Sequence, residues 1–174
     1  MTKNNQIILG IDPGLATTGY GVLTGSEAHM KPVAYGSIIT SPKMSLSQRL
    51  QIIYDEVSAI IEEYKPDEIG VEELFFSRNV TTALLVGQAR GVVLLAAQQR
   101  NLKLLEFKPV EVKMAVTGYG RADKRQIQQM VKILLGLPAI PKPDDTADAL
   151  AIAICHMQSR NLKILAQRVI EENR

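Results

Sequence analysis

The pattern of apolar and polar positions divides the chain into strands and helices. Short apolar runs bounded by proline, glycine or serine predict strands, and apolar positions three or four residues apart predict helices. The expected strands are 6–12, 19–24, 33–40, 68–72 and 103–107, and the expected helices are 45–64, 79–100, 109–116, 123–135 and 144–159. In chain order this gives three strands, a helix, a strand, a helix, a strand and three helices.

This order predicts an α/β fold built on a mixed five-stranded sheet flanked by helices. The turn at Pro13-Gly14 joins strands 6–12 and 19–24 in a hairpin, so one strand runs antiparallel to the rest. A helix precedes strand 68–72, and a right-handed crossover would place that strand parallel to strand 6–12. The two strands are therefore expected to be neighbours.

The helix expected over 79–100 differs from the others because it is apolar almost all round. Such a helix is buried on more than one side. Gly87 and Gly91 share one of its faces, where another backbone could approach closely. That backbone would belong either to the protein's own sheet or to a second copy of the chain in a two-fold dimer.

The composition describes a globular chain, with 46% hydrophobic and 22% charged residues. At 174 residues we expect one domain over 1–160 and a tail over 161–174 that adds a helix or stays mobile. Cys155 lies in an apolar run and is predicted to be a buried thiol. The N-terminal apolar stretch is cut by Asp12-Pro13, so it resembles neither a signal peptide nor a membrane span, and we expect a cytoplasmic protein.

The net charge of +2 hides an uneven distribution. Residues 54–73 contain eight acids and one lysine, whereas Arg78 to Lys132 contains ten bases and three acids. Such asymmetry is typical of an acidic site beside a surface that binds a polyanion, although solvated helix faces also produce it.

Two carboxylates are expected to meet at one edge of the sheet. Asp12 ends the first strand and Glu72 ends the fourth, and ligands of open α/β sheets gather at the carboxyl ends of strands. Two such acids repel each other unless a cation or a proton lies between them. The alternative is that Asp12 only shapes the turn and Glu72 is a solvated strand end.

The last expected helix adds further acids. Asp145 and Asp148 are three residues apart and share a helix face, as do Asp144 and Asp148. An acid at a helix start is often only a cap. That alternative explains Asp144 or Asp145, but it does not explain Asp148, which lies between apolar residues where an acid is rare.

Four carboxylates of this kind can hold two Mg²⁺ ions, which prefer oxygen ligands. Two-metal sites cleave phosphodiester bonds without a protein nucleophile. The chain has no cysteine-histidine cluster for zinc, and His29 and His156 are far apart in the sequence. It also has no GxxxxGK[ST] phosphate loop.

These segments resemble the RuvC family of bacterial crossover junction endodeoxyribonucleases. The resemblance rests on five motifs in the family's order, which are Ile-Leu-Gly-Ile-Asp-Pro-Gly at 8–14, Thr-Gly-Tyr-Gly-Val at 18–22, the strand ending at Glu72 with Phe75 after it, Gly-Gln-Ala-Arg-Gly-Val at 87–92 and Ala-Asp-Ala-Leu-Ala-Ile-Ala at 147–153. It implies an RNase H-like fold, a homodimer, Mg²⁺ dependence with Mn²⁺ as a substitute, and symmetric nicking of four-way DNA (Holliday) junctions in recombination and repair. It also implies partnership with the branch-migration proteins RuvA and RuvB.

Carried over to this sequence, the resemblance implies a set of site residues. The catalytic and metal-binding acids would be Asp12, Glu72, Asp145 and Asp148, and the DNA-binding residues would be Phe75, Arg78, Lys113 and Lys124. Glu73 follows Glu72, but strand alternation points the two acids to opposite faces. The lysines, considered without the resemblance, are more typical of solvated surface.

Three other functions fit parts of the pattern. A phosphotransferase of the actin and sugar-kinase type also begins with a glycine-bearing hairpin, but that fold needs two such lobes and this chain has length for one. Another RNase H-like nuclease, such as a resolvase of the YqgF type, would differ around the second and last acids. A nucleic-acid-binding module without catalysis would not need all four acids.

Overall fold

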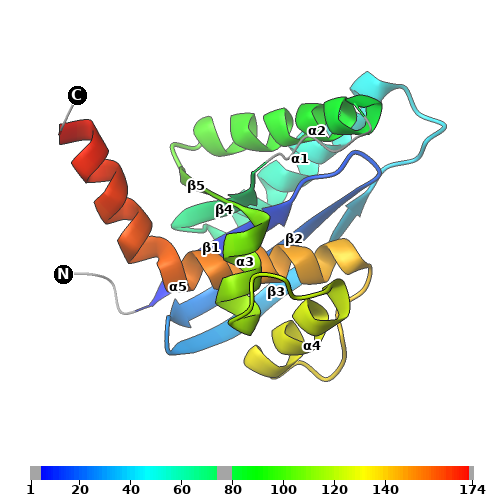
Figure 1. Ribbon diagram of the computed structural model, residues 1–174. Helices are drawn as coiled ribbons and strands as arrows, with labels where there is room; N and C mark the ends of the chain where they lie inside the picture. The colour runs from blue at the N-terminus through cyan, green and yellow to red at the C-terminus, as the bar shows by residue number, and fades with distance from the viewer. Residues whose placement is uncertain (1–4, 74–79, 173–174) are drawn as a thin grey trace.

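A computed structural model describes residues 5–73 and 80–172 and places a five-stranded sheet at the centre of the molecule (Figure 1). The sheet order is β3-β2-β1-β4-β5. The strands are β1 (Gln6–Asp12), β2 (Thr17–Ser26), β3 (His29–Ile39), β4 (Glu68–Glu72) and β5 (Lys103–Phe107), and the helices are α1 (Leu46–Tyr64), α2 (Val80–Gln98), α3 (Pro109–Thr117), α4 (Lys124–Leu134) and α5 (Asp144–Glu172).

The predicted order and topology are confirmed. β1 pairs with β2 antiparallel and with β4 parallel, and β5 continues the parallel side. β2 is thus the antiparallel strand of the mixed sheet. The bounds predicted for β1, β4 and β5 match the structure, whereas β2 and β3 are longer than predicted and the last helix continues to Glu172 instead of ending at 159.

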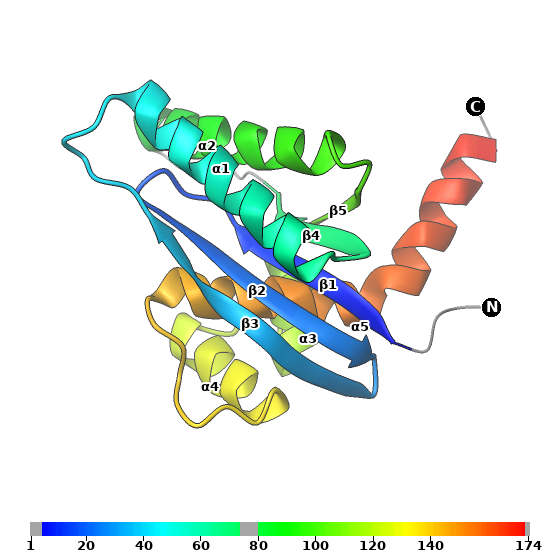
Figure 2. The same ribbon diagram turned by 180° about the vertical axis from the view of Figure 1, so that it is seen from behind.

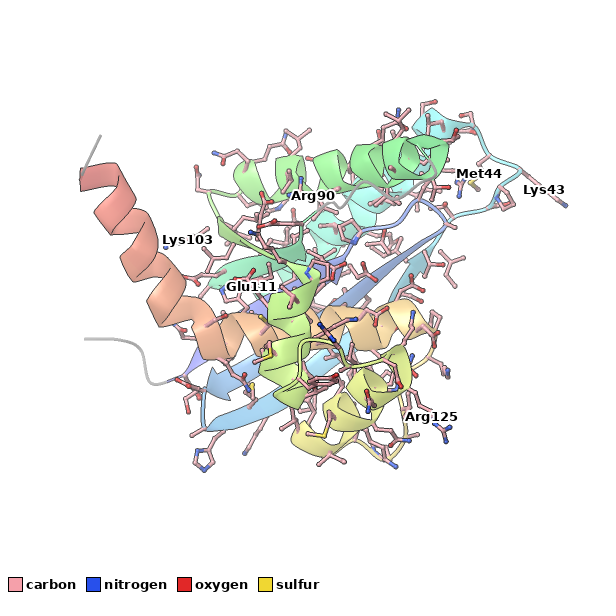
Figure 3. The ribbon with its side chains drawn as sticks, viewed as in Figure 1. Lys43, Met44, Arg90, Lys103, Glu111 and Arg125 are labelled. Carbon is pink, nitrogen blue, oxygen red and sulfur yellow. The ribbon has the colours of Figure 1, made fainter. Side chains whose placement is uncertain are left out.

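Helices cover both faces of the sheet. α1 and α2 lie on one face, and α5 crosses the other with α3 and α4 outside it (Figures 1 and 2). Arg90, the single charged residue of α2, lies between this helix and the strands (Figure 3). Within the described part of the chain no helix is both long and apolar enough to span a membrane.

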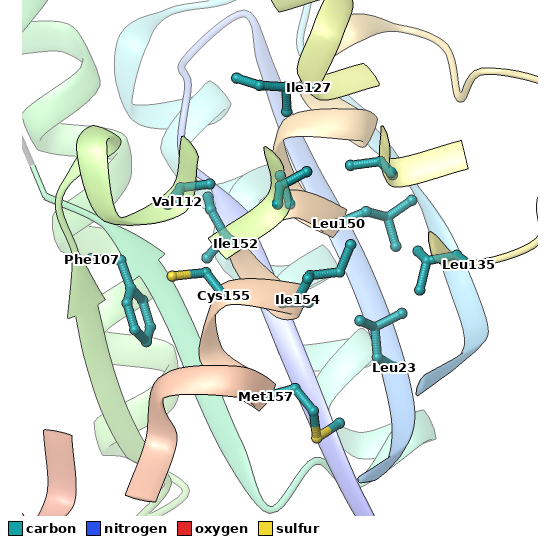
Figure 4. Packing of buried hydrophobic residues seen from close by; sticks show 14 of the residues in the cluster. Leu23, Phe107, Val112, Ile127, Leu135, Leu150, Ile152, Ile154, Cys155 and Met157 are labelled. Carbon is teal, nitrogen blue, oxygen red and sulfur yellow. The ribbon is translucent and has the colours of Figure 1, made fainter. Parts of the chain in front are cut away.

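Strand alternation divides the core into two clusters. Leu9, Ile11 and Val71 pack against α1 and α2, whereas Ile8 and Phe107 pack against α3, α4 and α5. Figure 4 shows the second cluster, where apolar side chains of α5 lie beside the sheet. Cys155 is 1% exposed there, which confirms the predicted buried thiol.

The start of α4 is fixed by its own sequence. The Asp123 carboxylate accepts a hydrogen bond from the main-chain N–H of Gln126 at 2.9 Å, and the Gln126 side chain accepts one from the Asp123 N–H. This reciprocal capping box satisfies two donors that a helix start would leave open. It sets the first residue of the helix at Lys124.

Candidate active site

The sheet brings two predicted acids to one edge and one face. Ile11 of β1 lies opposite Val71 of β4, and Asp12 and Glu72 are the next residues on the two strands. Because Ile11 and Val71 pack toward α1 and α2, alternation turns Asp12 and Glu72 toward α5. Glu73 follows the last residue of β4 and lines a neighbouring cavity that Asp12 and Glu72 also line, so its predicted exclusion from the site stays a prediction.

The start of α5 lies close to this edge because glycines leave room for its backbone. A β-carbon at Gly19 would lie 1.9 Å from the main-chain oxygen of Asp145, and one at Gly10 would lie 2.3 Å from that of Ala149. Gly19 is also the pairing partner of Asp12 across β1 and β2. The missing side chain at Gly19 therefore brings Asp145 near Asp12.

Three of the four predicted acids line one cavity of about 210 Å³. Asp12, Glu72 and Asp148 come from β1, β4 and α5, while Lys113 of α3 and Lys124 of α4 line the same cavity. Asp145 is not among the residues that line it, but its charge acts on Asp12 and Asp148. Residues far apart in the sequence thus form one acidic centre with two lysines beside it.

The acids raise one another's pKa. Burial, together with the charges of Asp148, Glu72 and Asp145, raises the pKa of Asp12 from 3.8 to about 8. Burial followed by the charge of Asp148 raises the pKa of Glu72, and burial raises the pKa of Asp148 despite an opposing hydrogen bond from Lys124. The arrangement favours a proton or another cation among the acids.

Lys124 is the nearest cation to these acids. Its Nζ lies 3.1 Å from Asp148 Oδ2 and 3.5 Å from Asp144 Oδ2. Asp144 also accepts a hydrogen bond from Lys142 at 3.0 Å, which lowers the pKa of this more exposed carboxyl. Asp144 is therefore paired with surface lysines and does not line the cavity.

The donor set fits a hard divalent cation. Among residues 5–73 and 80–172, no group of three or more His, Cys, Asp or Glu side chains lies close enough together to hold a metal ion. Like charges at short distance repel, and Lys124 already holds Asp148. The oxygen-only donors nevertheless are those that Mg²⁺ prefers.

The predicted DNA-binding residues are placed in part. Lys113 is half-buried in the cavity wall, and Lys124 is exposed at its rim. Phe75 and Arg78 lie outside the described residues, so their assignment stays a prediction. The sequence interpretation missed Arg90, which contacts the main chain of Glu72. Its signal was a lone charge in an otherwise apolar helix.

A family model described as crossover junction endodeoxyribonuclease RuvC matches residues 8–156. A protein of that name from Alkaliphilus oremlandii is 56% identical over 156 residues, covering 90% of this chain and 95% of the relative. One from Desulfitobacterium hafniense is 58% identical over 157 residues, with the same coverage of both chains. The residues matched by the family model include every acid of the site.

Solved structures give the same result. T. thermophilus RuvC in complex with a Holliday junction substrate superposes with a TM-score of 0.86 at 33% identity, covering 91% of this chain and 96% of that chain. The yeast mitochondrial Holliday junction resolvase Ydc2 superposes with a TM-score of 0.64 at 15% identity, covering 96% and 86%, which shows a shared fold. The predicted RNase H-like fold is confirmed.

Proposed function

The chain belongs to the RuvC family of crossover junction endodeoxyribonucleases, and on that premise we propose that it resolves Holliday junctions by paired symmetric nicks in recombination and repair. One observation carries the proposal most strongly. Asp12, Glu72 and Asp148 converge from three separate elements on a single cavity whose wall includes Lys113 and Lys124. Acids for metal and bases for phosphate are what DNA hydrolysis requires at one place.

Asp12, Glu72, Asp145 and Asp148 would hold two Mg²⁺ ions, with Mn²⁺ as a substitute. When bound, such ions supply an activated water and stabilise the charge of the departing oxygen. Asp12 can then lose the proton that its raised pKa otherwise retains, because the cation offsets the neighbouring carboxylates. The carboxylates of the four acids would serve as metal ligands, and the reaction would need no protein nucleophile.

Lys113 and Lys124 would bind phosphates of the junction close to the cut. Lys124 is 54% exposed and reaches Asp148 with a flexible side chain, so it can exchange that carboxylate for a DNA phosphate. Lys113 lowers the pKa of Glu72 from the cavity wall. Phe75 and Arg78 are proposed to contact the junction from the segment that follows β4.

A homodimer would place two such sites on one junction. Leu84 and Leu95 of α2 are 61% and 51% exposed, and Gln88 and Gly91 lie between them at helical spacing on the same side. A β-carbon at Gly91 would meet nothing within 4 Å, so this glycine does not serve packing on the protein's own sheet. An exposed face with two leucines on either side of a glutamine and a glycine suits an isologous contact. RuvA and RuvB are proposed partners, and the cytoplasm is the proposed location.

A synthetic four-way junction and a linear duplex of matched sequence test the proposal. With Mg²⁺ or Mn²⁺ the protein should nick both strands of like polarity in the junction and leave the duplex intact, and chelation should abolish cleavage. Light scattering should give about twice the 19.1 kDa chain mass. A monomer, or a protein that cuts duplex and junction alike, would contradict the proposal.

A further inference from the structure

Arg90 faces the acids from the side opposite to the lysines. It lines a second cavity of about 180 Å³ together with Asp12, Glu72, Glu73 and Pro109. Asp12, Glu72 and Pro109 also line the first cavity, whose other walls come from α3, α4 and α5. The carboxylates of Asp12 and Glu72 therefore lie between Arg90 on one side and Lys113 and Lys124 on the other.

The guanidinium of Arg90 connects the ends of two strands. Its Nε donates to the main-chain oxygen of Glu72 across 3.4 Å, and a terminal nitrogen forms an ion pair with Glu106. Glu106 lies on β5 beside Val71 in the parallel register. The ion pair with Glu106 fixes the orientation of the Arg90 guanidinium. Its Nε–H then points at the main-chain carbonyl of Glu72.

We infer that Arg90 is a positioning residue for the metal-binding carboxylates, an inference that rests on the proposed function. Its side chain is 15% exposed, far less than the 54% of Lys124, and the cavity beside it is walled by Asp12 and Glu72. Arg90 therefore acts on the site through Glu72, whose main chain it holds at the end of β4, and not by binding DNA.

This role explains why Arg90, a cation, lies between the apolar helix α2 and the sheet. The acids of the site repel one another, and β4 ends at Glu72. The Arg90 guanidinium bonds the main-chain oxygen of Glu72 and pairs with Glu106, so it holds the strand end that carries the Glu72 carboxylate. Residues that orient metal ligands from behind typically change metal affinity by about 10–100-fold when they are replaced.

Arg90→Met removes every donor but keeps the aliphatic packing, and Arg90→Lys keeps the charge without the planar fork. Arg100→Met is the matched control, because Arg100 also pairs with one carboxylate, Glu62, and contacts one main-chain oxygen, that of Ala96, far from the acids. Mn²⁺ binding to the protein without DNA is followed by the electron spin resonance of free Mn²⁺. Junction affinity without metal and the Mg²⁺ dependence of single-turnover cleavage are measured in parallel.

Arg90→Met should weaken Mn²⁺ binding by about 10–100-fold and raise the Mg²⁺ needed for half-maximal cleavage by the same factor. Junction affinity should stay within about twofold, Arg90→Lys should recover part of the loss, and Arg100→Met should change none of these. Unchanged Mn²⁺ binding in Arg90→Met, a loss of junction affinity, or an equal loss in Arg100→Met would each overturn the inference. An unaltered protein that binds Mn²⁺ and cuts junctions keeps the proposed function even then, whereas failure of the unaltered protein overturns both.

Discussion

Each end of β4 places a glutamate against α5, but the surroundings of the two glutamates differ. Glu68, at the start, is 5% exposed and its Oε2 lies 2.8 Å from Nε2 of the fully buried His156. Glu72, at the end, faces Asp12 and Asp148, and its pKa is raised. The same strand thus carries one acid matched by a base of the fold and one acid surrounded by like charges.

The different surroundings of Glu68 and Glu72 distinguish an acid that stabilises the fold from an acid that serves the site. A buried acid that serves only folding is stabilised by a partner within the chain, as Glu68 is by His156. Among the side chains that the structure describes, none donates a hydrogen bond to Asp12, and burial beside three other acids costs folding stability. Such a cost is expected where a ligand supplies the missing charge.

Removing charge from the acidic centre should give the largest effect. Asp12→Asn, Glu72→Gln or Asp148→Asn should reduce junction cleavage by on the order of a thousandfold, because several kcal/mol of transition-state stabilisation depend on the metal ligands. Junction binding should persist, since the bases remain. Glu56→Gln, at an exposed position of α1, is the matched control and should cut normally in single-turnover assays. Near-normal cutting by Glu72→Gln together with a loss in Glu73→Gln would move the role to Glu73.

The opposite end of β4 should respond in stability instead. Glu68→Leu removes the hydrogen bond to His156 and should lower the free energy of unfolding by about 2–4 kcal/mol. Thermal unfolding followed by circular dichroism should show a loss of roughly 5–15 °C. Cleavage per folded molecule should be kept at low temperature. Glu56→Leu, at an exposed position of α1, is the control; equal losses in both variants would remove the special role of the pair.

A smaller effect should appear in the pH dependence of the metal-free protein. A carboxyl whose folded pKa is raised from 3.8 to about 8 keeps its proton when the unfolded chain has lost it. The folded state then binds more protons, so the free energy of unfolding falls as pH rises from about 4 to 8. Asp12→Asn lacks this titration, so it should be more stable than the unaltered protein at pH 8 and similar to it at pH 4, with the difference growing as pH rises.

Urea unfolding in the presence of a chelator, measured at both pH values, checks this expectation. Glu72 and Asp148 also have raised pKa values, so a shallower decline should remain in Asp12→Asn. Stability of the unaltered protein that rises between pH 4 and 8 would contradict the sign. A decline of the same size in both proteins would assign the effect to other groups.

The sequence predicted most of the fold because its elements have simple boundaries. β1 is a continuous apolar run that Asp12-Pro13 ends, and β4 is a short one between Pro66 and Glu72. The sequence left open whether the tail after about residue 159 adds a helix or stays mobile, and in the structure α5 continues to Glu172. Local pattern does not reveal where a helix without a stop signal ends.

The acids of the site were predictable, and their partners were not. Strand ends and alternation placed Asp12 beside Glu72, and helix periodicity linked Asp145 to Asp148. The contact of Lys124 with Asp148 depends on how α4 packs against α5 across a proline-containing linker. That of Arg90 with Glu72 depends on which face α2 turns to the sheet. Both are set by tertiary packing, which no periodicity encodes.

The smallest expected effect concerns the salt dependence of DNA binding by the two lysines of the cavity. Removing one lysine that binds a phosphate should reduce the slope of log affinity against log salt concentration by roughly 0.9. Lys113→Ala and Lys124→Ala should each do so on junctions of any sequence, because lysines that bind phosphates do not read bases. Fluorescence anisotropy over a series of salt concentrations measures the slope without metal.

Lys124→Ala should differ from Lys113→Ala in one respect. In the metal-free protein the Lys124 ammonium lies 3.1 Å from Asp148, so its removal also leaves that carboxylate without its nearest cation. The pKa of Asp148 should then rise, because the hydrogen bond that opposes burial is gone. Lys113 lowers the pKa of Glu72 only through its charge. Carboxyl titrations by nuclear magnetic resonance should therefore move at Asp148 in Lys124→Ala, and unchanged salt slopes in both variants would make these lysines ordinary surface residues.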